Sequence, residues 1–161
     1  MLPTIRPAGF SDAQAIFRQI KAHPDELVTR PLGDIVANVD RFLVAEDSSG
    51  DIVGTVSWAI WPEPDPAAPP SVEIQSLSVA APCRGLGLGC GLVTAAVDRI
   101  SRLRPRQIVV LTFAPDFFDK LGFVPVSKES LMYKLFNGCM HCTRYASPFT
   151  CPEIAMALQL P

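Results

Sequence analysis

The chain has 161 residues, of which 48% are hydrophobic and 19% charged, and its formal net charge at pH 7 is −2. This length and composition are typical of one folded domain and not of a disordered segment. The small negative charge predicts no binding to nucleic acid, and no apolar run has the length of a membrane span or the form of a secretory signal. We expect a cytoplasmic protein, in which five cysteines are more often thiols or metal ligands than disulfides.

The first half of the chain predicts strands mixed with short helices. Helical spacing follows Ser11, a favourable N-cap with Gln14 three residues later, and a second short helix is expected after a cap at Asp34. Gly54 lies inside a predicted strand, where it should mark a bulge or a close approach of two backbones. Residues 61–70 hold five prolines and predict an extended loop. The strands expected here are residues 2–6, 42–46, 52–60 and 72–80, and the middle two form a hairpin.

The second half predicts a long helix followed by shorter elements. The helix ends before Pro105, and a buried β-branched strand over 107–113 follows it. A short helix over 116–121 should end at Gly122, and one or two closing strands are expected over 124–136. The predicted order is β-α-α-β-β-β-α-β-α-β, a mixed α/β (α+β) sheet with helices on both faces. The apolar stripe of the long helix is Leu88, Leu92, Ala95, Ala96, Ile100 and Leu103.

A glycine-rich turn joins the strand that ends near residue 80 to this long helix. Strand, glycine turn and helix in that order make an anion site, because glycines admit a ligand close to the backbone and the first helical amides point at it. A Walker P-loop is excluded, since no Lys followed by Ser or Thr is present, and Cys90 stands where a dinucleotide fingerprint needs its third glycine. The spacing that fits is R-x-x-G-x-G, with Arg84, Gly87 and Gly89. We expect a ligand that carries phosphates; the alternative is a turn that only packs helix against strand.

This motif resembles the pyrophosphate-binding turn of the GNAT superfamily of acetyl-CoA-dependent N-acetyltransferases. A second segment, Phe117 to Phe123, is similar to the F-Y-x-K-L-G-F segment of that family. The resemblance covers the chain up to about Phe136. It implies the GNAT fold, whose mostly antiparallel sheet is splayed at the acetyl-CoA site. It also implies a domain over residues 1–136, with a cysteine-containing extension over 137–161 packed on it.

The resemblance also implies the roles of individual residues around acetyl-CoA. A backbone N–H near Val79 or Ser78 would face the thioester oxygen, and the amides of the turn would hold the pyrophosphate. Phe118 stands where the family has a tyrosine acid, so the thiolate would leave unprotonated or take a proton from water, Tyr133 or Ser127. The residues implied in acetyl-CoA binding are Leu77, Ser78, Val79, Arg84, Gly85, Leu86, Gly87, Leu88, Gly89, Cys90, Phe117, Phe118 and Lys120.

Glu73 is the candidate base, because the two-residue period of a strand places it on the same face as Gln75 and Leu77. The alternative is a solvated carboxylate at a strand edge. Arg30 is the candidate for binding a substrate carboxylate, with Gln75 beside the acceptor, since a guanidinium matches a carboxylate with two hydrogen bonds. The alternative for Arg30 is an exposed arginine in a loop.

The cysteine-rich tail predicts a structural zinc site. Three thiolates and an imidazole are a suitable zinc set, and a C-x-x-C pair is half of one. The alternatives are small buried thiols or a redox pair between Cys139 and Cys142. The four candidate ligands are Cys139, His141, Cys142 and Cys151.

The segment that begins at Arg30 and the cysteine tail resemble short bacterial amino-acid N-acetyltransferases of the N-acetylglutamate synthase type. The leading hypothesis is therefore direct acetyl transfer from acetyl-CoA to a small-molecule amine, with glutamate the first substrate to test. A second hypothesis is a peptide N-terminus or a polyamine as acceptor. A third is a CoA- or metal-binding interaction module with weak catalysis. Many members of the family pair through their last strands, so a homodimer is a mild expectation.

Overall fold

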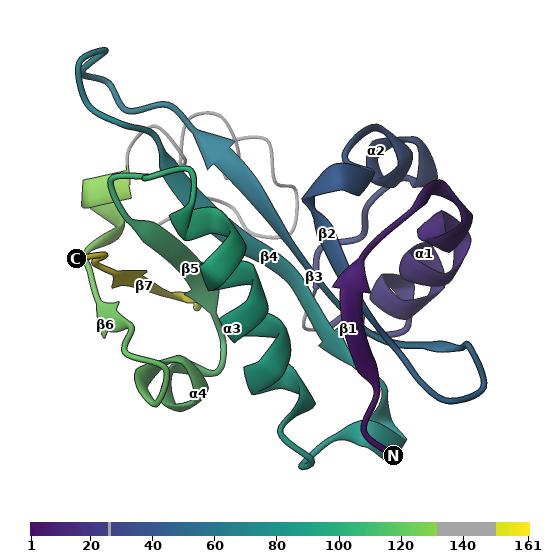
Figure 1. Ribbon diagram of the computed structural model, residues 1–161. Coiled ribbons are helices and arrows are strands. Elements are labelled where there is room, and N and C mark those ends of the chain that lie inside the picture. The colour runs from purple at the N-terminus through teal and green to yellow at the C-terminus, as the bar shows by residue number, and fades with distance from the viewer. Residues whose placement is uncertain (26, 132–150) are drawn as a thin grey trace. The chain divides into compact units, whose positions relative to one another are not determined.

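The computed structural model describes residues 1–25, 27–131 and 151–161 of the chain (Figure 1). Two compact units are present, the first made of Met1–Ala59 with Ile74–Arg99 and the second of Ile60–Glu73 with Ile100–Pro161. The strands are β1 Thr4–Pro7, β2 Phe42–Glu46, β3 Ile52–Trp61, β4 Ser71–Val79, β5 Ile108–Thr112, β6 Val124–Pro125 and β7 Ile154–Leu158. The α-helices are α1 Ala13–Lys21, α2 Leu32–Ala37, α3 Leu88–Ser101 and α4 Pro115–Asp119.

The strands follow the order β1-β2-β3-β4-β5-β7-β6. Strand β4 takes part in both units: its first residues pair with β5 in parallel, and its later residues belong to the first unit. The β1–β2, β2–β3, β5–β7 and β6–β7 pairs are antiparallel. The predicted mixed, mostly antiparallel sheet is therefore confirmed.

In the first unit, helices cover both faces of the sheet. Phe42 and Val44 of β2 pack with buried side chains of α1 and α2, which include Ile16 and Ile35. On the opposite face, α3 approaches so closely that a Cβ added to Gly91 would lie 3.1 Å from the Ile5 side chain. The first four residues of β2 are all buried because helices cover the sheet on both sides.

Gly54 is a site of close approach, as its position in a strand predicted. A Cβ atom at this position would lie 3.0 Å from Leu92 Cδ1 of α3 and 3.2 Å from the backbone oxygen of Ser78. The pairing of β2 with β3 is also irregular beside Gly54, between Ala45 and Glu46. Both expected features, the bulge and the close contact, are present.

In the second unit, β5 lies between β4 and β7, and β6 pairs with β7. Of the closing strands predicted over 124–136, the structure shows β6 at Val124–Pro125, and a short 3₁₀ helix follows at Lys128–Leu131. Residues 132–136 lie outside the described residues, so that part stays a prediction. The strand next to β5 is β7, for which the sequence predicted nothing. Pairing on both of its edges makes residues 154–158 a strand, although their local pattern is weak. The expected boundary at residue 136 lies outside the described residues and stays a prediction.

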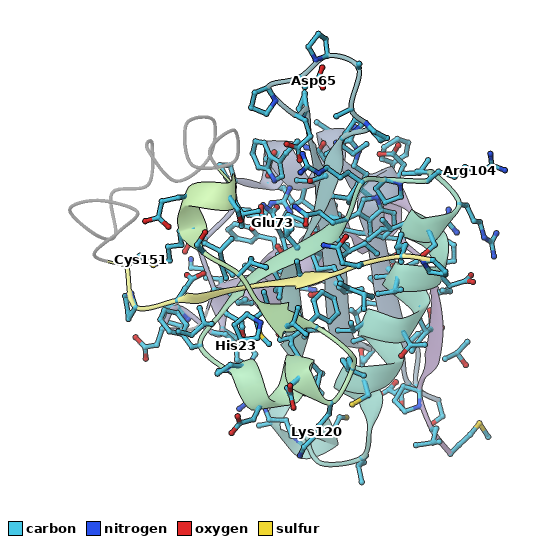
Figure 2. The ribbon with its side chains drawn as sticks, turned by 90° about the vertical axis from the view of Figure 1, so that its left-hand side faces the viewer. His23, Asp65, Glu73, Arg104, Lys120 and Cys151 are labelled. Carbon is cyan, nitrogen blue, oxygen red and sulfur yellow. The ribbon has the colours of Figure 1, made fainter. Side chains whose placement is uncertain are left out.

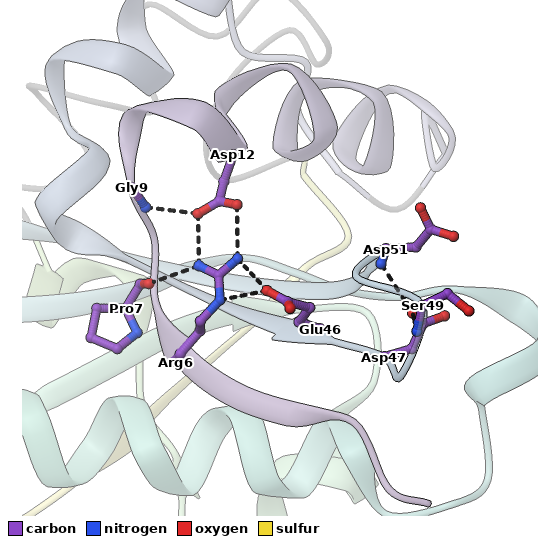
Figure 3. A network of polar contacts seen from close by, with 8 residues as sticks. All are labelled: Arg6, Pro7, Gly9, Asp12, Glu46, Asp47, Ser49 and Asp51. Atoms are coloured by element: carbon purple, nitrogen blue, oxygen red, sulfur yellow. Dashed lines mark hydrogen bonds and ion pairs between the residues drawn. The ribbon is translucent and has the colours of Figure 1, made fainter.

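Two predicted helix caps are wrong. Helix α1 begins at Ala13 after a short 3₁₀ helix, and the carboxylate of Asp12, not Ser11, accepts a hydrogen bond from the Gly9 N–H at 2.7 Å (Figure 3). Helix α2 begins at Leu32, so Asp34 lies inside it. Asp12 instead binds Arg6 of β1, and Asp34 binds Arg30, four positions earlier in the chain.

The apolar stripe of α3 is confirmed except at its end. Leu88, Leu92, Ala96 and Ile100 are buried, but the helix ends at Ser101 and Leu103 is 59% exposed. In the second unit, Gly122 has φ of +90° and ends α4 as predicted. Its N–H binds the Asp119 oxygen and the Phe123 N–H binds the Phe118 oxygen, the Schellman arrangement. Within the described ranges, no helix is long and apolar enough to cross a bilayer.

Candidate functional site

The glycine turn of the first unit has the backbone of an anion site. After a short 3₁₀ helix at Ala81–Cys83, Gly85 and Gly87 adopt φ of +78° and +80°, values that favour glycine. Helix α3 then starts at Leu88, and its first-turn amides lack partners within the helix. That first turn contains no acidic residue, so the partial positive charge of the helix end is not neutralised.

The predicted turn residues around these glycines are largely exposed. Arg84, Gly85, Leu86, Gly87 and Cys90 are on the surface, Gly89 is half-buried and Leu88 is buried in the core. Arg84 Nε donates to the backbone oxygen of Val79 at 3.1 Å, which folds the guanidinium back over the end of β4. The arrangement offers several amides and one cation to a phosphate-bearing ligand.

Strand β4 is distorted shortly before this turn. Ser76 has φ of +52°, a left-handed conformation that costs about 1–3 kcal/mol for a residue with a side chain. Two fully buried hydroxyls of β3 hold the distorted segment: Thr55 Oγ1 donates to the Ser76 oxygen at 2.8 Å, and Ser57 Oγ donates to the Gln75 oxygen at 3.3 Å. The backbone of β4 is thus fixed in an unusual conformation beside the predicted site.

Arg30 lies against this distorted segment. Its Nε donates to Asp34 Oδ2 at 2.7 Å, and its Nη1 donates to the hydroxyls of Ser57 and Ser76 at 3.0 and 3.3 Å. The guanidinium also lies 4.9 Å from the centre of the Phe42 ring. The side chain is 17% exposed, so the alternative of an exposed loop arginine is wrong.

The same unit contains a second polar cluster that the sequence did not predict. Gln19 Nε2 donates to Ser78 Oγ at 2.9 Å, and the same Oγ lies 3.1 Å from His23 Nδ1. His23 Nδ1 is also 2.9 Å from the backbone oxygen of Gln19 near the end of α1. No sequence signal joins His23 to Ser78, because the contact spans 55 positions and depends on how α1 docks on the sheet.

Glu73 belongs to the second unit and is 4% exposed, so the alternative of a solvated strand-edge carboxylate is wrong (Figure 2). Trp61 Nε1 donates to Glu73 Oε2 at 2.8 Å. Sequence spacing did not indicate this partner, since Trp61 ends β3 across the proline-rich loop. A charge-assisted hydrogen bond of this kind orients a buried carboxylate.

The aromatic segment of the second unit is part of its core. The Phe118 ring is 4% exposed and packs edge-to-face against Phe117 and Phe123, at centroid distances of 5.0 and 5.3 Å. Phe118 therefore supplies packing and no proton. Lys120 is exposed after the end of α4.

The predicted zinc ligands are only partly described. Cys139, His141 and Cys142 lie outside the described residues, and so does Tyr133. Cys151 is a half-buried free thiol, and its backbone oxygen accepts a hydrogen bond from Lys128. No group of three or more histidine, cysteine or acidic side chains with metal-binding geometry occurs in residues 1–25, 27–131 and 151–161. The zinc site stays a prediction.

The first unit thus contains the glycine turn, the distorted part of β4, Arg30 and the His23 cluster, whereas Glu73 and Phe118 belong to the second. Gln75, in the first unit, is half-buried, and its backbone oxygen binds Ser57. Leu77 is also half-buried and Ser78 is buried. The local geometry of the first unit fits an anionic, phosphate-bearing ligand at the turn.

Comparison with known proteins agrees with this geometry. A family described as acetyltransferase (GNAT) domain matches residues 38–125. An uncharacterised N-acetyltransferase of Chlorobaculum tepidum is 29% identical over 158 residues, which cover 97% of this chain and 96% of that protein. An amino-acid acetyltransferase of Mycobacterium tuberculosis is 26% identical over 139 residues, 84% of this chain and 76% of the relative.

A solved structure shares the fold of this chain. Rv2747 of Mycobacterium tuberculosis, in complex with CoA and NLQ, superposes with a TM-score of 0.80 at 24% identity, over 99% of this chain and 100% of that one.

Proposed function

The chain belongs to the GNAT acetyltransferase family and is an acetyl-CoA-dependent N-acetyltransferase, and we propose that its acceptor is a small amine that carries a carboxylate. An amino acid, glutamate first, is the class that we favour. The relative named as an amino-acid acetyltransferase supports this choice. The observation that carries it is the arrangement of Arg30.

Arg30 is held in place by protein contacts, and some of its N–H groups are still available to a ligand. Its Nε and Nη1 protons bind Asp34, Ser57 and Ser76, but its Nη2 has no hydrogen-bond partner within the described part of the chain. The Ser76 hydroxyl accepts from Arg30, and no described group accepts its proton. Two guanidinium N–H groups and one hydroxyl are therefore placed to bind a carboxylate.

Acetyl transfer requires that the acceptor ammonium lose a proton before it attacks. We propose Glu73 for this step, since a carboxylate oriented by Trp61 can accept a proton directly or through a water molecule. The amides of residues 84–90 would hold the pyrophosphate, and the backbone N–H of Val79 or Ser78 would face the thioester oxygen. The amine nitrogen would attack the thioester carbon directly, and the C–S bond would break to release the CoA thiolate.

The test is a thiol-release assay with acetyl-CoA and a panel of amino acids, their decarboxylated amines, polyamines and short peptides. We expect turnover with amino acids and much less with the matched amines. Arg30→Met should raise the acceptor KM by roughly 10- to 100-fold, the value of hydrogen bonds to a charged group, and leave the acetyl-CoA KM unchanged. Arg99→Met, which removes an exposed charge from α3, is the control.

Equal turnover of an amino acid and its decarboxylated amine would rule out a carboxylate-bearing acceptor. Thermal melting of Arg30→Met and of the charge-preserving Arg30→Lys separates loss of binding from loss of folding. At a site that binds through a planar fork of donors, lysine should not restore the acceptor KM.

A further inference from the structure

His23 has its two ring nitrogens in different situations. Nδ1 is 2.9 Å from the backbone oxygen of Gln19, a group that can only accept. Nδ1 must therefore carry a proton, and the lone pair of the neutral ring is on Nε2. The described residues offer no partner to Nε2. The half-buried imidazole thus presents one bare acceptor nitrogen.

Ser78 and Gln19 fix this imidazole on strand β4. Ser78 Oγ accepts from Gln19 Nε2 at 2.9 Å and lies 3.1 Å from the protonated Nδ1, so donors face the hydroxyl oxygen from two sides. Ser78 is 5% exposed, which makes the contact a buried one.

The His23 cluster is next to the Arg30 cluster. Arg30 contacts Ser76 and His23 contacts Ser78, two positions later on β4. Two residues of a strand span about 6–7 Å, so both clusters are within reach of one small molecule that has a carboxylate and an amine. Both clusters belong to the first unit.

We propose that His23 is a catalytic residue for the second of the two protons that the acceptor ammonium loses. After Glu73 has taken the first, Nε2 takes the second from the attacking nitrogen and returns it to the departing thiolate. This inference rests on the proposed acetyl transfer. When the amine nitrogen bonds to the thioester carbon, one N–H proton moves to Nε2 and Nδ1–H stays on the Gln19 oxygen. When the C–S bond breaks, its electron pair goes to sulfur, and the imidazolium returns that proton to form the CoA thiol. Phe118 has no proton to give, so this step needs another group.

The decisive variant is His23→Asn. Its side-chain amide can keep the Nδ1-like donor to the Gln19 oxygen, but it has no nitrogen at the place of Nε2 and cannot carry a proton. We expect kcat to fall by about 100-fold or more, a typical contribution of general acid–base catalysis. The acceptor KM, the affinity for CoA and the melting temperature should change little.

His23→Ala tests the same step from another side, because added imidazole should restore a measurable part of its kcat. Gln19→Met removes the donor to Ser78 and keeps the backbone oxygen that binds Nδ1. If Gln19 only positions His23, kcat should fall less in this variant than in His23→Asn. If folded His23→Asn retains kcat within about threefold, His23 only caps α1 and the proposal is wrong.

The two proposals fail in different ways. If the wild type acetylates amines without a carboxylate as well as amino acids while His23→Asn is slow with all of them, the acceptor class is wrong and the role of His23 stands. If amino acids are preferred and His23→Asn is as fast as the wild type, the reverse holds. A wild type that binds CoA and acetylates no amine overturns both.

Discussion

A single methyl group at Gly54 should destabilise the first unit. The added Cβ would lie 3.0 Å from Leu92 Cδ1, 3.2 Å from the Ser78 oxygen and 3.4 Å from Ala45 Cβ. Leu92 is fully buried and the Ser78 oxygen is backbone, so neither neighbour can move away cheaply. Overpacking costs about 1–3 kcal/mol, and alanine regains about 0.4–1 kcal/mol by restricting the unfolded chain. We expect a net loss of about 1–2 kcal/mol for Gly54→Ala.

Gly33→Ala is the matched control, since it adds the same methyl group at a position where no atom stands in its way. Gly33 lies in α2, and a Cβ there would meet nothing within 4 Å. Helix propensity then predicts a gain of about 0.5–1 kcal/mol.

Urea unfolding at 25 °C measures both free energies, and the expected melting shifts are about 2–4 °C per kcal/mol. If Gly54→Ala is as stable as the wild type while Gly33→Ala gains stability, the contacts around Gly54 can open and the overpacking argument is refuted.

Two further predictions concern buried carboxylates. Trp61→Phe keeps an aromatic ring but removes the hydrogen bond to Glu73, so kcat in the thiol-release assay should fall about tenfold. In a Glu73→Gln background the same substitution should lower kcat much less, and equal losses in both backgrounds would contradict a shared role. The hydrogen bonds from Arg6 lower the pKa of Asp12, so this carboxylate stabilises the fold above the unfolded pKa of about 4, and that stability is lost as pH falls through the folded pKa (Figure 3). Asp12→Asn should lower the free energy of unfolding by about 1 kcal/mol at pH 7, a value reduced because Arg6 is 35% exposed. In urea unfolding at pH 7, 4 and 3, the variant should lose less stability than the wild type as the pH falls.

Features set by local chemistry could be predicted from the sequence. Strand β2 has the expected bounds because a buried apolar run ends at a polar turn, and Gly122 ends α4 because its φ of +90° favours glycine. The glycine turn is predictable for the same reason, since the positive φ values at Gly85 and Gly87 favour glycine over other residues.

Features set by distant partners could not be predicted. Residues 154–158 form strand β7 because β5 and β6 pair with both of its edges. The contact of His23 with Ser78 likewise needs the packed fold. A single sequence reports local preference, whereas these features depend on segments that meet only after folding.

The place of β7 beside β5 has a consequence for synthesis of the chain on the ribosome. Strand β5 is made well before β7, because β6 and residues 126–153 come between them. Until residues 154–158 have been made, one edge of the apolar β-branched run Ile108–Thr112 lacks its partner. Such an edge is a template for intermolecular pairing. A nascent chain that stops short of β7 should therefore depend on chaperones and tend to aggregate.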